Sequence, residues 1–276
     1  APPFALSVSS TSHYGVPVRV PDPAANHFPN PQRVHILGLP VDNITYDDWI
    51  SIIGDWIAEP GEVRVRQVCT INPEFMMMAR RDVNFRNILR RAALCVPDGA
   101  GLLWAARRRG TPLRQRVTGS DGVPKIAAAA AEHEWRLFFL GAAPGVAERA
   151  AEVLRARHPS LTIVGAYSGS PAPEEEDEIV ARVNGSGAHI LFVAYGAPEQ
   201  DKWIARNLPR LKVRMAMGVG GTFDFIAGVV PRAPAWMQRL GLEWLFRLAL
   251  QPWRIGRMLR LPRFVLAVLT RSKPSS

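Results

Sequence analysis

Between residues 136 and 219, short apolar segments alternate regularly with segments of helical spacing. The apolar segments predict strands at 136–140, 161–166, 189–195 and 213–219, and the segments between them predict helices at 145–157, 174–183 and 198–207. Strands that are separated by helices pair in parallel, and the helices cover the sheet. The alternation therefore predicts an α/β fold with a Rossmann-like, mainly parallel sheet and helices on both faces.

Polar residues follow four strand-like segments. The run 94–97 ends at Asp98, the run 63–69 ends at Thr70 and Asn72, and Arg116 and the stretch 195–200 follow similar segments. In open α/β sheets, ligands bind outside the carboxyl ends of the strands. Asp-Gly after a proline is also ordinary turn chemistry, and on this ground alone Asp98 would be a turn residue. Four polar strand ends together predict one site.

The glycine-rich stretch 218–225 is a further candidate. Gly220 and Gly221 allow a close approach of the backbone, and Asp224 follows soon after. A contact to a ribose or a base and a plain turn are both open interpretations of it. The small residues at 139–145 match neither the P-loop nor the full dinucleotide-binding pattern. No Asp-x-Asp motif, Ser-His-Asp order or zinc-ligand spacing occurs, so we expect no metal site.

The net charge of +10 is concentrated near the C-terminus. From Arg232 onward, nine basic residues accompany one acid, Glu243, so this segment carries +8 of the net charge. A near-neutral body with a basic, aromatic tail favours an anionic membrane or an anionic ligand over nucleic acid. The apolar runs in the tail are shorter than the roughly 20 residues that span a bilayer. Docking of a basic amphipathic helix on a partner protein stays open.

Shifts in composition predict three parts. Residues 1–33 are rich in Pro, Ser and Asn and are expected to form a flexible lead, 34–231 the α/β domain, and 232–276 a basic helical appendage. The run 34–39 is predicted to be the first strand. Cys69 and Cys95 end apolar runs without metal-like spacing, so we expect them to be reduced core residues. No basic segment followed by an apolar core begins the sequence, which favours a cytoplasmic protein.

Several motifs in a fixed order resemble the WecG/TagA/CpsF family of bacterial glycosyltransferases, over about residues 34–269. The motifs are Thr70-x-Asn72, Pro97-Asp98-Gly99, Arg116-x-x-Gly119, Gly196-Ala197-Pro198-x-Gln200, Gly220-Gly221-x-Phe223-Asp224, Gly241-Leu242-Glu243-Trp244-x-x-Arg247 and Pro252-x-Arg254-x-x-Arg257. Each motif is weak alone, and their common order is specific.

The resemblance implies an inverting, metal-independent transfer of a hexose or N-acetylhexosamine-type sugar. The donor would be a UDP-sugar, and the acceptor a polyprenyl-diphosphate-linked sugar at the cytoplasmic face of the membrane, in polysaccharide or cell-envelope glycan synthesis. The implied general base is Asp98. The other candidates are Thr70, Asn72 and Arg116 beside the base, and Gly196, Gln200, Gly221, Asp224, Arg247, Arg254 and Arg257 at the substrates.

The expected partners follow from the same resemblance and from the tail. They are the UDP-sugar, the lipid-linked acceptor, the membrane surface through the appendage, and a second copy of the chain; no nucleic acid and no cofactor are expected. A different class stays open, namely a non-catalytic protein that binds a nucleotide-sugar or nucleic acid through its basic tail. Such a protein would bind arbitrary DNA with a steep dependence on salt. The donor sugar does not follow from the sequence, because small contacts choose among hexoses.

Overall fold

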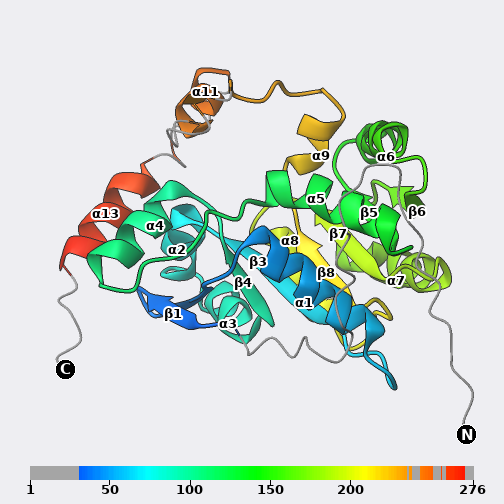
Figure 1. Cartoon of the computed structure of the whole chain (residues 1–276), viewed down its shortest axis with the longest axis horizontal. Helices are drawn as coiled ribbons and strands as arrows, with labels where there is room; N and C mark the ends of the chain where they lie inside the picture. The colour runs from blue at the N-terminus through cyan, green and yellow to red at the C-terminus, as the bar shows by residue number, and fades with distance from the viewer. Residues whose placement is uncertain (1–30, 235, 238–242, 251–255, 257–258, 271–276) are drawn as a thin grey trace, which may run out of the picture. The chain divides into compact units, whose positions relative to one another are not determined.

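A six-stranded parallel sheet is the centre of the computed structural model, which describes residues 31–234, 236–237, 243–250, 256 and 259–270 (Figure 1). Its strands are β3 (Arg66–Ile71), β4 (Leu94–Pro97), β5 (Arg136–Gly141), β6 (Thr162–Tyr167), β7 (Ile190–Ala194) and β8 (Met215–Gly218). They lie in the order β4-β3-β8-β7-β5-β6, and every pairing in the sheet is parallel. The predicted α/β fold is confirmed.

Helices cover both faces of the sheet. Successive side chains of a strand point to opposite faces, and here both sets are apolar and buried. Phe139 and Phe192 pack on one face in a buried cluster, and Leu140 and Val193 pack in another cluster on the opposite face. The first cluster includes residues of α1 (Tyr46–Ala58), α5 (Gly119–Glu132), α6 (Val146–Arg157) and α9 (Thr222–Ile226), and the second includes residues of α7 (Glu176–Gly185) and α8 (Glu199–Asn207). A short helix, η1 (Pro173–Glu175), precedes α7.

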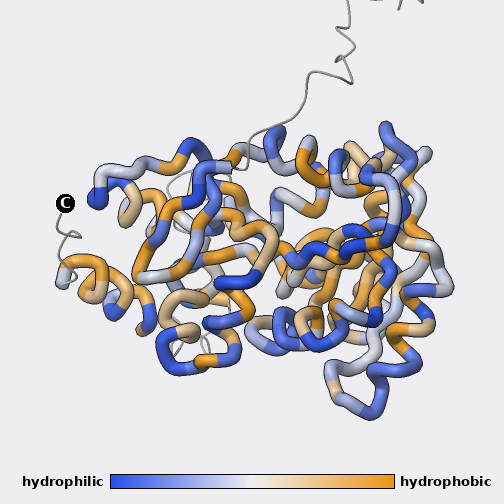
Figure 2. Tube along the Cα trace, turned by 90° about the horizontal axis from the view of Figure 1, so that it is seen from below, coloured by the Kyte–Doolittle hydropathy of each residue, from blue (hydrophilic) through white to orange (hydrophobic). Residues whose placement is uncertain are grey.

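The strands and helices predicted between residues 136 and 219 are found, and their ends lie within two residues of the expected positions. In Figure 2, hydrophobic segments are concentrated in the interior of the chain trace, whereas hydrophilic residues are frequent on its outer turns. Cys69 and Cys95 are buried and free of a disulfide, as expected.

The predicted first strand at 34–39 is found only as far as Ile36, because the chain then turns back in a hairpin. β1 (Arg33–Ile36) and β2 (Leu39–Asp42) pair antiparallel in a separate two-stranded sheet. Leu37 and Gly38 form the turn with φ values of 52° and 82°. The reversal of chain direction is not recognisable in the sequence, because the apolar Leu37 continues the apolar run through the turn. Asp42 ties the hairpin to β4 by accepting the Cys95 N–H at 2.6 Å.

The C-terminal helix α13 (Arg260–Thr270) packs on the body of the chain. Phe264 is fully buried, and Phe264, Ala267 and Val268 belong to one apolar cluster with residues of α2 (Pro73–Ala79), α3 (Val83–Arg91) and α4 (Ala100–Arg108). Figure 1 shows α13 beside α4 and α2. The other described helix of the tail is α11 (Glu243–Leu250). None of the described helices has the length and apolar character that a bilayer crossing requires.

Candidate active site

A cavity of about 850 Å³ lies at the carboxyl ends of β3, β4, β7 and β8. The sequence-derived candidates that line it are Thr70, Asn72, Asp98, Arg116, Gly196, Gln200 and Gly221. The structure thus brings these polar residues together. Those that follow β3, β4, β7 and β8 meet because neighbouring parallel strands finish at the same edge of a sheet. The expected strand before Arg116 is wrong, because Arg116 reaches the cavity from the loop between α4 and α5.

The register of β3 against β4 places Asn72 and Asp98 next to one another. Ile71 is opposite Pro97, so the two polar residues leave adjacent strands at the same level, and the Asp98 N–H donates to the Ile71 carbonyl at 2.7 Å. Gly99 follows with a φ of +114°, a conformation that side chains disfavour, and α4 begins at once. The half-buried Asp98 is therefore held at the strand end, on the cavity wall.

Several helices begin at the rim of this cavity. Asn72 accepts the Phe75 N–H at 2.9 Å and caps α2, and Thr118 accepts the Asp121 N–H at 3.1 Å and caps α5. Helices α4, α8 and α9 also start beside cavity residues. The first N–H groups of a helix and its dipole favour negative charge. The cavity is therefore suited to an anionic group such as a diphosphate.

Gln200 joins the loops that follow β7 and β8. Its side chain is buried, and its Oε1 accepts the N–H groups of Gly196 at 3.1 Å and Gly220 at 2.9 Å. A Cβ at Gly218 would lie 2.5 Å from the Gln200 Nε2, so only glycine leaves room for this side chain. Gln200 shapes the backbone wall of the cavity, which makes it a positioning residue in this structure. The Ala197–Pro198 peptide in the same loop is cis.

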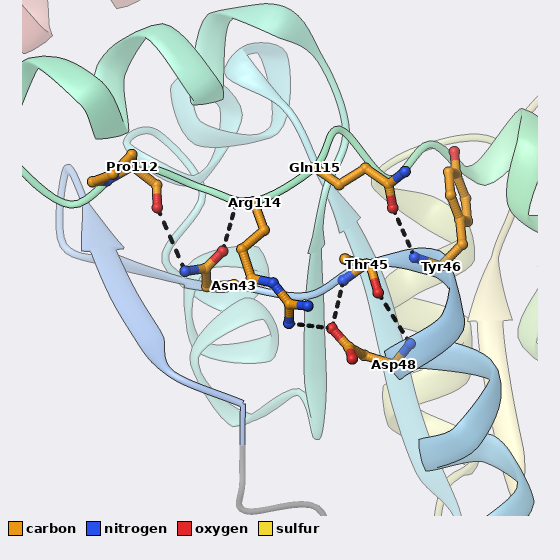
Figure 3. A network of polar contacts seen from close by, with 7 residues as sticks. All are labelled: Asn43, Thr45, Tyr46, Asp48, Pro112, Arg114 and Gln115. Carbon is orange, nitrogen blue, oxygen red and sulfur yellow. Dashed lines mark hydrogen bonds and ion pairs between the residues drawn. The ribbon is translucent and has the colours of Figure 1, made fainter.

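The loop that carries Arg116 is tethered to the start of α1 (Figure 3). The Arg114 N–H donates to Asn43 at 2.7 Å, the Arg114 guanidinium pairs with Asp48 at 2.6 Å, and the Tyr46 N–H donates to Gln115 at 2.9 Å. Arg116 itself is half-buried, lines the cavity and makes no ion pair within the described part of the chain. Its charge is available to a bound anion.

A hydrogen-bonded network stands behind the cavity wall at Thr118. The Thr118 N–H donates to the Tyr46 hydroxyl at 2.9 Å, and the Thr118 hydroxyl donates to Asp121 at 3.0 Å. Burial raises the pKa of Tyr46, the Thr118 hydrogen bonds partly oppose the rise, and the negative charges of Asp121 and Asp98 add to it. Tyr46 therefore remains a neutral hydroxyl that holds Thr118 in place.

Helix α13 supplies one wall of the cavity, which the sequence did not predict. Arg260 and Phe264 from α13 line it together with Trp104 from α4, and the Arg260 guanidinium pairs with Glu74 at 2.8 Å. The tail residues expected at the substrates were Arg247, Arg254 and Arg257, whereas Glu74, Trp104 and Phe264 were not expected there. The helical spacing of apolar residues in α13 predicts a helix with a buried face. It does not identify the residues against which that face packs.

Four candidates are not placed at this cavity. Asp224 lies on α9 and is absent from the residues that line the cavity. Arg247 lies on α11, where its side chain is not described, and Arg254 and Arg257 lie outside the described residues. Within the described ranges, no group of three or more His, Cys, Asp or Glu side chains could hold a metal ion.

Asp201 is a buried carboxylate next to Gln200. Its side chain is fully enclosed, and neither carboxylate oxygen has a hydrogen-bond partner of normal geometry in the described structure. Burial raises the pKa of Asp201 to about 7, and the neighbouring Cys69 and Gln200 side chains offset only part of the rise. Nothing in the sequence marks this group as unusual, because Asp201 lies in the polar first turn of a helix, where acids are ordinary.

Comparison with known proteins identifies one family. The sequence model of the glycosyl transferase WecG/TagA/CpsF family matches residues 34–276. The chain is 32% identical over 206 residues to the N-acetylglucosaminyldiphosphoundecaprenol N-acetyl-beta-D-mannosaminyltransferase of Bacillus subtilis (strain 168), which covers 75% of this chain and 80% of that protein. It is 30% identical over 240 residues to the protein of the same name from Staphylococcus aureus (strain MW2), with 87% and 93% covered.

Proposed function

Because the chain belongs to the WecG/TagA/CpsF family of glycosyl transferases, we propose that it transfers a sugar from a UDP-sugar to a sugar carried on a polyprenyl diphosphate. The names of the two relatives give N-acetylmannosamine as the transferred sugar and N-acetylglucosaminyl diphosphoundecaprenol as the acceptor. With the proposed UDP carrier, UDP-N-acetylmannosamine is the first donor to test. The observation that carries the proposal is one cavity that holds Asp98 together with Arg116 and the N-termini of several helices.

Asp98 is the general base of the proposed reaction. The acceptor hydroxyl attacks the anomeric carbon from the face opposite the UDP, and the new carbon–oxygen bond forms as the bond to the diphosphate oxygen breaks. The hydroxyl proton passes to Asp98, and the bonding electron pair leaves with UDP. One well-placed carboxylate is enough for this inverting step. The position of Asp98 on the cavity wall supports this role.

The leaving diphosphate gains negative charge during transfer, and positive groups in the cavity stabilise it. Arg116 and the first turns of α4 and α5 supply fixed positive charge, and a guanidinium can bind a diphosphate through paired hydrogen bonds. We propose that these groups, with Arg247, Arg254 and Arg257 of the tail, do this work without a metal ion.

We further propose that the tail places the active site at the inner face of the cell membrane. Leu266 and Leu269 of α13 are exposed, whereas Arg260 and Phe264 of the same helix line the cavity. Adsorption of α13 to lipid would therefore act on the cavity wall directly. Exchange of Leu266 and Leu269 for serine should weaken binding to anionic vesicles and leave melting temperature unchanged. Undiminished vesicle binding would contradict a membrane role for this face.

Release of UDP tests the main proposal. A panel of UDP-sugars is assayed with and without a polyprenyl-diphosphate sugar, using the unchanged chain, Asp98→Asn and the control Asp177→Asn, whose carboxylate is 92% exposed on α7. We expect acceptor-dependent release from one donor, a loss of at least about 100-fold in Asp98→Asn, and normal release in Asp177→Asn. An unimpaired Asp98→Asn would remove Asp98 from the mechanism. No release from any donor, with steeply salt-dependent DNA binding, would favour the binding-protein alternative.

A further inference from the structure

A second, smaller hollow lies between the β1–β2 turn and helices α2 and α3. Its volume is about 200 Å³. Three arginines line it, Arg80 at the end of α2 and Arg86 and Arg90 on α3, and no acidic side chain does. The remaining lining residues are Leu37, Gly38, Leu39, Met76 and Ala79. We call this feature the arginine pocket.

The charges in the arginine pocket are not balanced by the protein. Arg86 and Arg90 are four residues apart on α3, a spacing at which like charges destabilise a helix. Neither they nor Arg80 form an ion pair in the described structure. At similar spacings elsewhere, arginines meet acids: Arg182 pairs with Glu178, and Arg149 with Glu152.

The acidic residue nearest to Arg86 along the chain of α3 already has other partners. Asp82 stands four residues before Arg86, but it accepts the Phe85 N–H at 2.9 Å and pairs with Lys202 at 2.8 Å. The contacts with Lys202 and with the Phe85 N–H lower the pKa of Asp82, so its carboxylate interacts with these two groups. Arg86 therefore has no counterion from its own helix.

Arg86 also has a buried donor with no acceptor. Its Nε is shielded from solvent and has no hydrogen-bond partner in the described residues. Arg90 makes only long contacts, of 3.4 Å, from its guanidinium to the Gly38 carbonyl. A buried donor without a partner is unfavourable, so the protein leaves part of the hydrogen-bonding capacity of the Arg86 guanidinium unused.

The arginine pocket is separate from the candidate active site. The two cavities share no lining residue. Helix α2 touches the active-site cavity with Pro73, Glu74 and Phe75 and the arginine pocket with Met76 and Ala79, so its two sides face different cavities. A ligand in the arginine pocket is therefore not a substrate in the site described above.

We propose that the arginine pocket binds a phosphate group. Three guanidinium groups match the several oxygens and the negative charge of phosphate, and guanidinium–phosphate hydrogen bonds are among the strong ones. The volume lies below the range of about 300–1,000 Å³ that is typical for drug-sized ligands, so the pocket encloses a group of the size of a phosphate. Free phosphate and a phospholipid headgroup carry the same chemistry.

Nitrogen-15 NMR of the arginine side chains tests the site directly. The Nε–Hε signal of Arg86 is assigned by its absence in Arg86→Lys and is followed during titration with sodium phosphate at constant ionic strength. We expect a saturable shift in the unchanged chain, because the Nε belongs to the guanidinium that binds phosphate. The shift persists in Arg116→Gln, which alters only the other cavity. A signal that stays still throughout the titration would overturn the proposal.

Matched variants provide a second measurement that does not depend on the assignment. Phosphate should raise the melting temperature of the unchanged chain and of Arg91→Gln, which removes an arginine of α3 outside the pocket, and should do so much less in Arg86→Gln/Arg90→Gln. Without phosphate, the double variant should be at least as stable as the unchanged chain, because a like-charge pair is removed. Equal phosphate effects in the double variant and in Arg91→Gln would contradict the site.

Vesicles distinguish the two sources of phosphate. Binding to phosphatidylcholine vesicles is compared with binding to vesicles that also contain phosphatidylglycerol. If the double variant loses binding to the anionic vesicles and Arg91→Gln does not, the pocket takes a lipid headgroup. If both variants bind these vesicles equally while only the double variant has lost the response to phosphate, the pocket takes free phosphate.

Discussion

Arg232 donates a 2.6 Å hydrogen bond to Asp121 across 111 residues of sequence. The other carboxylate oxygen of Asp121 accepts the hydroxyl of Thr118, which lines the active-site cavity. Arg232 is also the residue at which the charge of the chain changes from near-neutral to strongly basic. The ion pair therefore fastens the start of the basic segment to the wall of the cavity.

Breaking this pair should cost about 1 kcal/mol of unfolding free energy, because both side chains are about 30% exposed and the charge also stabilises the first turn of α5. A double-mutant cycle of Asp121→Asn and Arg232→Gln measures it, and thermal melts supply the values. The cycle of Arg149→Gln and Glu152→Gln is the control, with a coupling near zero, since both groups are more than 60% exposed. Equal couplings in the two cycles would refute the anchoring role.

Arg116 offers a test of the charge in the cavity. Arg116→Gln should lower kcat/KM by about 100-fold, the scale of losing one donor to a developing charge. Arg116→Lys keeps the charge but not the planar fork, so it should recover only part of the rate. Steady-state kinetics at fixed ionic strength checks both. Full activity in Arg116→Gln would exclude the residue from diphosphate binding, and unchanged melting temperatures would show that the fold is intact.

Gly218→Ala should lower the free energy of unfolding by about 1 to 3 kcal/mol. Its Cβ would meet the Gln200 side chain at 2.5 Å, and Gln200 is buried and holds two loops. Gly185→Ala is the matched control, because a Cβ there meets nothing within 4 Å and it ends α7. Chemical denaturation of both variants measures the difference. A loss in Gly185→Ala as large as that in Gly218→Ala would argue against the clash.

Asp201 predicts how stability depends on pH. Its pKa is about 7 in the folded chain against an ordinary value of 3.8, so between these values the folded state holds a proton that the unfolded state has lost. The stability contributed by the protonated form is complete below pH 3.8 and is lost as pH rises through 7. Asp201→Asn lacks this titration.

The melting temperature of Asp201→Asn minus that of the unchanged chain should therefore rise between about pH 4 and pH 7 and stay constant above. A gain of about 2 °C or more at pH 8 is expected. Differential scanning calorimetry across this range makes the comparison, and other titrating groups cancel because both chains share them. A difference that is flat with pH would mean that Asp201 is ionised throughout.

The sequence predicted the sheet and the strand ends because those signals are local. Buried parallel strands are continuous apolar runs, and the helices between them have their own period, so 136–219 could be read residue by residue. Asp98 and Asn72 were found for the same reason, because each directly follows such a run. The hairpin at 33–42 was missed because its turn contains Leu37, which gives no polar break.

What the sequence by itself determined was the strands of the six-stranded sheet, their common direction and the polar residues at their ends. Only the tertiary structure decided what lies across the cavity from them. The pairing of Arg260 with Glu74, the buried contact of Phe264 with the body, and the unbalanced arginines around the arginine pocket join residues far apart in the chain. Such contacts depend on how helices pack. An apolar face of a helix indicates that the face is buried, but it does not indicate which residues bury it.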